Sequence, residues 1–198
     1  MKNNVEQYFR HLGSLLRNIL VTDKNGKALS FNIGIEFCVN KIEKAGYDGK
    51  NLFFIGNGAS ASIASHAATD FWKNVGIRAS AFNDSSLLTC ISNDFGYKYV
   101  FEKPLCMFAD SDDILFSISS SGKSENIILA TKTARRNNLK IITLSGFKKN
   151  NPLRKLGDIN FYVPYSDYGF VEVIHTAICH CFVDMTKISF KKKVKENG

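Results

Sequence analysis

The sequence predicts an α/β protein built on a five-stranded parallel sheet with helices on both faces. Short apolar runs that alternate with helical patterns are typical of this class. The first run covers residues 52–55 and leads through a glycine turn into a helical pattern over 60–72. The other strands are expected at residues 77–82, 114–118, 140–144 and 159–163. No internal repeat or interdomain linker interrupts the alternation, so we expect all 198 residues to form a single domain.

Two helices are expected ahead of the first strand of the sheet. Apolar residues recur at helical spacing over residues 5–19 and, less regularly, over 30–45. Because these helices precede the strand alternation, we expect them to cover one face of the sheet or to pack against another subunit. Later helices are expected over 99–108, 127–136 and 171–188. The predicted parts are an N-terminal helical pair (1–48), an α/β core (49–190) and a basic tail (191–198).

Composition and charge limit the classes of function. Hydrophobic residues make up 44% of the chain, which favours a packed core. We find no apolar run of membrane-spanning length and no secretory signal, and five cysteines without Cys-x-x-Cys spacing indicate reduced thiols in a cytoplasmic protein. The net charge of +8 favours anionic partners. Without a nucleic-acid-binding motif we expect no nucleic acid partner and interpret the lysine-rich tail as a solvated helix end.

A serine-rich turn between a strand and a helix is the first candidate binding site. It carries four hydroxyl side chains and a glycine, namely Ser119, Ser120, Ser121, Ser124 and Gly122. Backbone N–H groups and the positive end of a helix dipole attract an anion at such a turn, and hydroxyls add donors for phosphate oxygens. The turn is similar to part of a P-loop, but Ser117 stands where that motif requires glycine. The alternative is a turn that only caps the helix.

Two other turns are expected near the serine-rich turn. Ligands of parallel α/β sheets bind beyond the carboxyl ends of the strands. Gly56-Asn57-Gly58 follows the first strand directly, so it lies at that edge together with the serine turn. Asn93-Asp94 joins them if its loop folds back over the same edge.

Histidines and carboxylates on two predicted helices form a second candidate site. His66 and Asp70 are four residues apart and therefore share one helix face. The last helix carries Glu172, His175 and His180. Two histidines and two carboxylates can bind zinc or act as an acid–base pair. The alternative for His66 and Asp70 is a surface pair or a contact between packed helices.

Taken in order, these motifs resemble those of phosphoheptose isomerases in the sugar-isomerase (SIS) domain superfamily. The resemblance covers nearly the whole chain and rests on Gly56-Asn-Gly-Ala-Ser60 with His66 and Asp70, Ser92-Asn-Asp-Phe-Gly-Tyr97, Ser117-Ile-Ser-Ser-Ser-Gly-Lys-Ser124, and Glu172-Val-Ile-His175 with His180. It implies a flavodoxin-like SIS domain that forms homotetramers, with active sites between subunits and bound zinc. It also implies isomerisation of sedoheptulose 7-phosphate to D-glycero-D-manno-heptose 7-phosphate for lipopolysaccharide or other cell-surface heptose.

The resemblance implies a role for each matching residue. Asp70 and His180 would be catalytic. The metal ligands would be His66, Asp70, Glu172 and His180. The phosphate would be held by Ser119, Ser120, Ser121 and Ser124. The sugar would be lined by Asn57, Gly58, Ala59, Asp70, Asn93, Asp94 and Glu172.

Two departures from the family pattern keep other functions open. Asp70 stands where the family has glutamate, and Glu172 stands where it has glutamine, which adds a negative charge beside the metal or the sugar. These changes favour an isomerase for a different phosphosugar as one alternative. A non-catalytic SIS regulator that binds a phosphosugar or a protein is the other. Because regulatory relatives lack the last catalytic histidine, the presence of His180 favours an enzyme.

Overall fold

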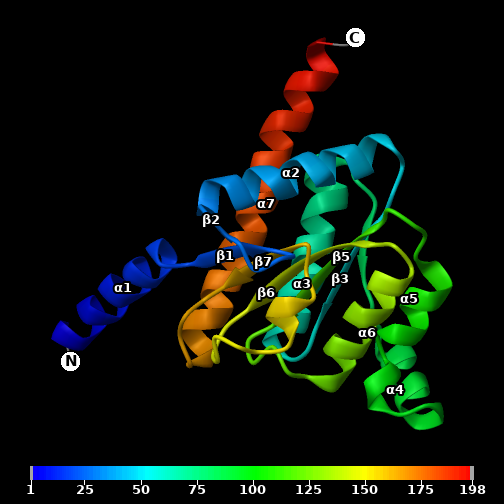
Figure 1. Cartoon of the computed structure of the whole chain (residues 1–198), viewed down its shortest axis with the longest axis horizontal. Coiled ribbons are helices and arrows are strands. Elements are labelled where there is room, and N and C mark those ends of the chain that lie inside the picture. Colours follow the sequence, from blue (N-terminus) through cyan, green and yellow to red (C-terminus); the bar gives the residue numbers. More distant parts are fainter. Residues whose placement is uncertain (1, 197–198) are drawn as a thin grey trace.

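A seven-stranded sheet forms the middle layer of the protein in this computed structural model (Figure 1). The structure describes residues 2–196, with side chains described for residues 4–190. The strand order is β2-β1-β7-β6-β5-β3-β4. All five predicted strands are present: β3 (Leu52–Gly56), β4 (Ala79–Ala81), β5 (Ile114–Ser119), β6 (Lys140–Ser145) and β7 (Ile159–Tyr162). Their mutual pairings are all parallel, which confirms the predicted α/β class.

The sheet is two strands wider than predicted because a hairpin extends one edge. Strands β1 (Leu20–Asp23) and β2 (Ala28–Leu29) pair antiparallel, and β1 also pairs antiparallel with β7. The connecting turn contains Gly26 at φ +79°, a left-handed conformation that glycine adopts without strain. The Asp23 carboxylate accepts the backbone N–H groups of Asn25 and Lys27, both at 2.9 Å. The segment between the two leading helices is therefore part of the sheet.

Helices cover both faces of the sheet, as predicted. One face carries α2 (Phe31–Tyr47), α3 (Ala59–Asp70) and α7 (Tyr168–Glu196). The other carries α4 (Ser85–Asp94), α5 (Glu102–Phe108) and α6 (Glu125–Arg136). Strand residues alternate between two apolar clusters: Phe54 and Phe116 belong to the first, whereas Phe53 and Leu115 belong to the second. Each such buried side chain stabilises the fold by about 1.5–3 kcal/mol.

The two leading helices differ in how they pack. Ser30 caps α2 by accepting the Ile33 N–H, and α2 lies against the sheet and α7. Helix α1 (Lys2–Arg17) instead projects from the body of the protein (Figure 1). Val5 and Phe9 on α1 are 54% and 64% exposed. The prediction that the leading helices cover a face thus holds for α2, while α1 leaves apolar side chains uncovered.

Three short segments and the chain end complete the description. A π-helical turn, η1 (Phe71–Val75), directly follows α3, and the predicted helix over 99–108 is divided into η2 (Tyr97–Tyr99) and α5. A third short helix, η3 (Leu153–Lys155), follows β6. The side chains of the tail, 191–198, lie outside the described residues, so its interpretation as a solvated end stays a prediction. Within the described chain, no helix is both long and apolar enough to cross a membrane.

Candidate active site

The serine turn is buried at its start and carries a hydroxyl that lacks a hydrogen-bond partner among the described residues. It joins the carboxyl end of β5 to the first turn of α6. Ser119 accepts the Gly122 N–H at 3.2 Å, and Ser119 and Ser120 are only 6% and 5% exposed. The Ser120 Oγ is buried without a hydrogen-bond partner among the described residues, and Ser124, the N-cap of α6, makes no side-chain capping bond. Because a buried polar group is costly when unpaired, the Ser120 hydroxyl indicates a site for a polar ligand, and the half-buried Ser124 hydroxyl offers a further donor beside it.

The segment after β6 supports the serine turn from behind. Gly122 has φ +62°, and a Cβ at this position would collide with the side chain of Asn151. The Leu153 N–H donates to the Gly122 carbonyl at 3.0 Å, and the Gly146 N–H donates to the Ser120 carbonyl at 2.9 Å. The backbone of the turn is therefore fixed before any ligand binds.

The first glycine turn is tied to the start of α6 by a pair of amides. The side chains of Asn57 and Asn126 exchange two hydrogen bonds, both at 2.9 Å, and Asn126 is 3% exposed. The Tyr97 hydroxyl donates to Asn57 Oδ1 at 3.1 Å. Gly58, at φ +55°, is the N-cap of α3, and Ala59 is its first residue. The contacts of Asn126 and Tyr97 were not predicted, since a buried asparagine and an exposed tyrosine carry no signal for pairing across 40–69 residues.

The predicted pair Asn93 and Asp94 lies at the end of α4 and is exposed. Asn93 Nδ2 donates to Asp94 Oδ1 at 2.9 Å, and the Cys90 thiol lies 3.6 Å from Asp94 Oδ2. These hydrogen bonds are local to α4. The loop connects with the glycine turn through Tyr97 instead.

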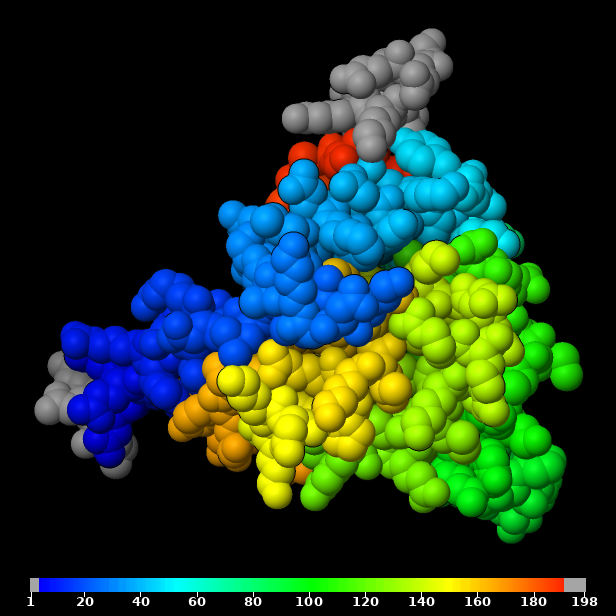
Figure 2. Space-filling model, viewed as in Figure 1, coloured from blue at the N-terminus to red at the C-terminus, as the bar shows by residue number. Residues whose placement is uncertain are grey.

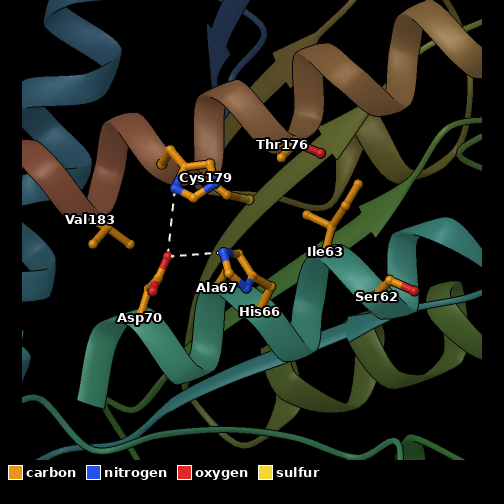
Figure 3. Close-up of a pocket in the computed structure, with 9 residues that line it drawn as sticks. Ser62, Ile63, His66, Ala67, Asp70, Thr176, Cys179 and Val183 are labelled. Carbon is orange, nitrogen blue, oxygen red and sulfur yellow. Dashed lines mark ion pairs between the residues drawn. The ribbon is translucent and has the colours of Figure 1, made fainter. Parts of the chain in front are cut away.

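Three of the predicted ligand residues meet across α3 and α7. Asp70 Oδ2 lies 3.3 Å from His66 Nε2 and 3.6 Å from His180 Nδ1 (Figure 3). Asn74 Nδ2 donates a hydrogen bond to the other carboxylate oxygen, Asp70 Oδ1, at 3.0 Å. One ligand atom from each of His66, Asp70 and His180 lies within 4.8 Å of the others. We call this set the histidine cluster.

The histidine cluster opens to solvent through a small hollow. Its volume is about 230 Å³, and Ile63, Thr176, Cys179 and Val183 are among its other lining residues. The side chains of His66 and His180 are 62% and 47% exposed, whereas that of Asp70 is 16% exposed. Burial raises the pKa of the Cys179 thiol to about 12, so this sulfur is neutral at pH 7. A shielded carboxylate between two accessible imidazoles suits a ligand that approaches from solvent.

Glu172 and His175 lie on α7 but outside the histidine cluster. Glu172 is eight residues before His180, about 12 Å along the helix axis, and is half-buried. His175 is fully buried, with its Nε2 3.2 Å from the Ser145 carbonyl oxygen. Burial lowers the pKa of His175 to about 4, and the hydrogen bond to Ser145 opposes this shift only in part. His175 is therefore neutral at pH 7 and links α7 to the end of β6.

The histidine cluster has the donor set of a transition-metal site. Two imidazole nitrogens and one carboxylate oxygen suit zinc, and three protein ligands leave a coordination position open for substrate. The same groups can also serve as a general acid–base pair, since an imidazole can both accept and donate a proton. The residues therefore fit both roles that the sequence left open.

Comparison with known proteins places the chain in a family. The family model of the SIS domain matches residues 7–146. A phosphoheptose isomerase of Neisseria gonorrhoeae has the same fold, with a TM-score of 0.81 at 23% identity over 93% of this chain and 97% of that one. The chain is thus an SIS-domain protein.

Sequence relatives define the family more narrowly. The phosphoheptose isomerase of Tolumonas auensis is 32% identical over 182 residues, which cover 85% of this chain and 93% of the relative. That of Glaesserella parasuis is 34% identical over 151 residues, 73% of this chain and 78% of the relative. The chain belongs to the phosphoheptose isomerase family.

Proposed function

We propose that the protein isomerises sedoheptulose 7-phosphate to D-glycero-D-manno-heptose 7-phosphate, as a step toward lipopolysaccharide or other cell-surface heptose. Membership of the phosphoheptose isomerase family supports this reaction class. The observation that carries the proposal is the presence, in one chain, of a serine turn with an unpartnered buried hydroxyl and a cluster of two histidines and a carboxylate. The first feature suits the phosphate of the substrate, and the second suits proton transfer.

In this proposal the serine turn anchors the phosphate and thereby positions the sugar. Ser119, Ser120, Ser121 and Ser124 supply hydroxyls, and the first turn of α6 supplies backbone N–H groups. Binding energy from the phosphate, remote from the reacting carbons, orients those carbons for reaction. We propose that the sugar is lined by Asn57, Gly58, Ala59, Asp70, Asn93, Asp94 and Glu172.

Aldose–ketose isomerisation moves a proton between neighbouring carbons through an enediol. We assign His180 and Asp70 to this transfer. Without zinc at His180, Asp70 faces Nδ1 of this ring, which favours the tautomer with a proton on Nδ1 and leaves the Nε2 lone pair free to accept the carbon-bound proton. The imidazolium then returns a proton to the adjacent carbon. Asp70 holds the charged ring in place during the transfer. A zinc ion on His180 would take the place of this base function, so the two roles of His180 are alternatives.

We propose that His66, Asp70 and His180 hold one zinc ion, with Glu172 as the fourth predicted ligand. The first three already lie within reach of one ion, whereas Glu172 lies about two turns away on α7. A bound zinc would supply a Lewis acid that polarises the substrate carbonyl. Activity that survives complete removal of metal by a chelator would restrict the site to acid–base chemistry.

We also propose a cytoplasmic homotetramer with active sites between subunits. The uncovered apolar side chains of α1, including Val5 and Phe9, support assembly because they have no cover within the described chain. The five cysteines all lie in the described region and form no disulfide, in keeping with a reducing compartment. A monomer in light scattering at micromolar concentration would contradict the assembly.

A different phosphosugar is the second candidate substrate. Asp70 and Glu172 replace the glutamate and glutamine of the family pattern, so the charge and the reach around the sugar differ. This alternative keeps the serine turn and the histidine cluster in the same roles. A regulator without catalysis would bind phosphosugar through the serine turn alone.

Turnover of sedoheptulose 7-phosphate by the purified protein tests the proposal. We expect an aldose 7-phosphate to accumulate, detectable by NMR, and His180→Asn to abolish its formation. Binding of sedoheptulose 7-phosphate without turnover, with or without added zinc, would contradict the enzyme and favour a regulator. Turnover of a five- or six-carbon ketose phosphate alone would contradict the proposed substrate and preserve the isomerase.

A further inference from the structure

A basic hollow lies between the β1–β2 hairpin and the segment 148–155, and its lining contains none of the residues assigned to catalysis or sugar binding. The hairpin and this segment meet side by side on the surface in Figure 2, in blue and yellow. The hollow has a volume of about 680 Å³. Ligand pockets typically measure about 300–1,000 Å³. The space is therefore large enough for a small molecule.

The charges around this hollow are unbalanced. Lys24, Lys149, Arg154 and Lys155 line it, with Asp23 as the one carboxylate among the lining residues, which leaves a net charge of +3. Asp23 already accepts two backbone N–H groups of its own turn. Among the described residues, no carboxylate lies within ion-pairing distance of the four cations. An anion in the hollow would neutralise charge that the protein leaves unpaired.

Arg154 is fixed in an orientation that suits such an anion. Its Nη1 donates to the Lys149 carbonyl at 3.0 Å, and its guanidinium carbon lies 4.5 Å from the centre of the Tyr162 ring. Its backbone N–H donates to Asn151 Oδ1 at 3.1 Å. Partial burial lowers the pKa of Arg154 from its ordinary value, because the cation has lost part of its water. A planar guanidinium held in this way offers its remaining N–H groups as a preformed fork for phosphate oxygens.

We propose that this hollow binds a small molecule that carries a diphosphate group, with Arg154 as the central contact and Lys24, Lys149 and Lys155 around it. The net charge of +3 exceeds what a single phosphate neutralises and matches two linked phosphates. A second basic hollow shares Lys24 and Lys155 with the first and adds Lys132 and Arg136, which gives room for the rest of the ligand. The shared chemistry is the diphosphate, whether it belongs to a nucleotide or to another diphosphate ester.

Calorimetric titration with inorganic pyrophosphate tests the proposal. The full chain should carry Ser119→Ala and Ser121→Ala, so that binding at the serine turn is weakened. One site per chain should remain, with an affinity for pyrophosphate at least tenfold above that for inorganic phosphate. ADP as a third titrant separates the sources: affinity equal to that of pyrophosphate limits recognition to the diphosphate, and higher affinity adds a nucleoside contact. Loss of all binding in the serine variant would overturn the proposal.

Charge-matched variants separate the hollow from the general basicity of the chain. Arg154→Gln should weaken pyrophosphate binding at least tenfold, and Arg154→Lys should weaken it less because it keeps the charge but not the fork. Arg78→Gln is the control, since Arg78 is exposed and directly precedes β4, at the opposite edge of the sheet. If Arg154→Gln unfolds the chain, the double variant Lys24→Gln and Lys155→Gln replaces it, since both lysines are exposed. This variant should also weaken pyrophosphate binding, because it removes two charges of the hollow. Equal binding by the hollow variants and the Arg78 control would refute the site.

Discussion

The serine turn and the histidine cluster differ in how far the chain fixes their geometry. Ser119, Ser120 and Gly122 of the turn are buried, and backbone hydrogen bonds from Gly146 and Leu153 hold the turn from behind. The histidine cluster consists of side chains from two helices, and both imidazoles are about half or more exposed. Among the described residues, only Asn74 donates a hydrogen bond to its carboxylate. The serine turn is therefore preorganised by the backbone, whereas the histidine cluster is held by side chains that a ligand can still adjust.

The largest expected effect is on the histidine cluster. His180→Asn keeps polarity and approximate size but cannot accept the proton, so turnover should fall about a hundredfold or more. The melting temperature should stay near that of the wild type because His180 is 47% exposed on its side chain. Steady-state kinetics and thermal unfolding on the same preparation measure both quantities. A variant that unfolds early but keeps its turnover per folded molecule would assign His180 a packing role.

Acid should lower the free energy of unfolding through the buried His175, which contacts the end of β6. Burial lowers the pKa of His175 to about 4 from an ordinary value near 6.5. Between these two pH values the unfolded chain binds a proton at His175 and the folded chain does not. Stability is therefore full above pH 6.5 and declines as the pH falls toward 4, by about 3 kcal/mol in total from this residue. Urea unfolding at several pH values measures the decline.

His175→Gln is the matched control for that decline. Glutamine cannot be protonated in this range and still offers a donor to the Ser145 carbonyl. Between pH 6.5 and 4, the free energy of unfolding of the His175→Gln variant should fall by about 3 kcal/mol less than that of the wild type. An identical decline in both proteins would show that other groups cause it.

The serine turn should respond in binding rather than in stability. Ser120→Ala removes a buried hydroxyl that has no partner among the described residues, so the free energy of unfolding should stay constant or rise slightly. The KM for phosphosugar should rise about tenfold, which corresponds to the loss of one hydrogen bond to a charged group, about 1.4 kcal/mol. A lower melting temperature with unchanged KM would show that the hydroxyl serves the fold.

The smallest expected effect concerns the departure from the family pattern at position 70. Asp70→Glu lengthens the side chain by one methylene and introduces the residue that the family resemblance implies at this position. Because Asp70 already lies 3.3 and 3.6 Å from the two histidines, we expect turnover of sedoheptulose 7-phosphate to rise no more than severalfold. The ratio of kcat/KM for seven-carbon and six-carbon ketose phosphates measures any change in preference. A large loss of activity with both substrates would show that the cluster is adapted to aspartate.

Much of the fold could be predicted because its signals are local. The apolar runs of β3, β5, β6 and β7 and the glycine turns between strands and helices are short-range patterns. The β1–β2 hairpin also has a local signal, Asn25-Gly26, but the strands it joins are too short to show alternation. Helix periodicity alone does not show that α1 projects while α2 packs, since both carry apolar residues at helical spacing.

The parts of the candidate site that depend on residue spacing along one helix could be predicted from the sequence. The parts that depend on how distant elements pack together could not. The four-residue spacing of His66 and Asp70 placed them on one face of α3, and His180 meets them there. Glu172 shares α7 with His180, but it lies about two helical turns from the histidine cluster along that helix. The amide pair of Asn57 and Asn126 depends on how β3 and α6 are brought together, which no short-range pattern encodes.

We infer that binding and chemistry are divided between the serine turn and the histidine cluster. Steady-state kinetics of sedoheptulose 7-phosphate turnover by Ser120→Ala and His180→Asn, measured side by side, tests it most directly. We expect Ser120→Ala to raise KM with kcat within about twofold of the wild type, and His180→Asn to lower kcat about a hundredfold or more with little change in KM. A His180→Asn protein that turns over at the wild-type rate, or a Ser120→Ala protein with unchanged KM, would contradict the division.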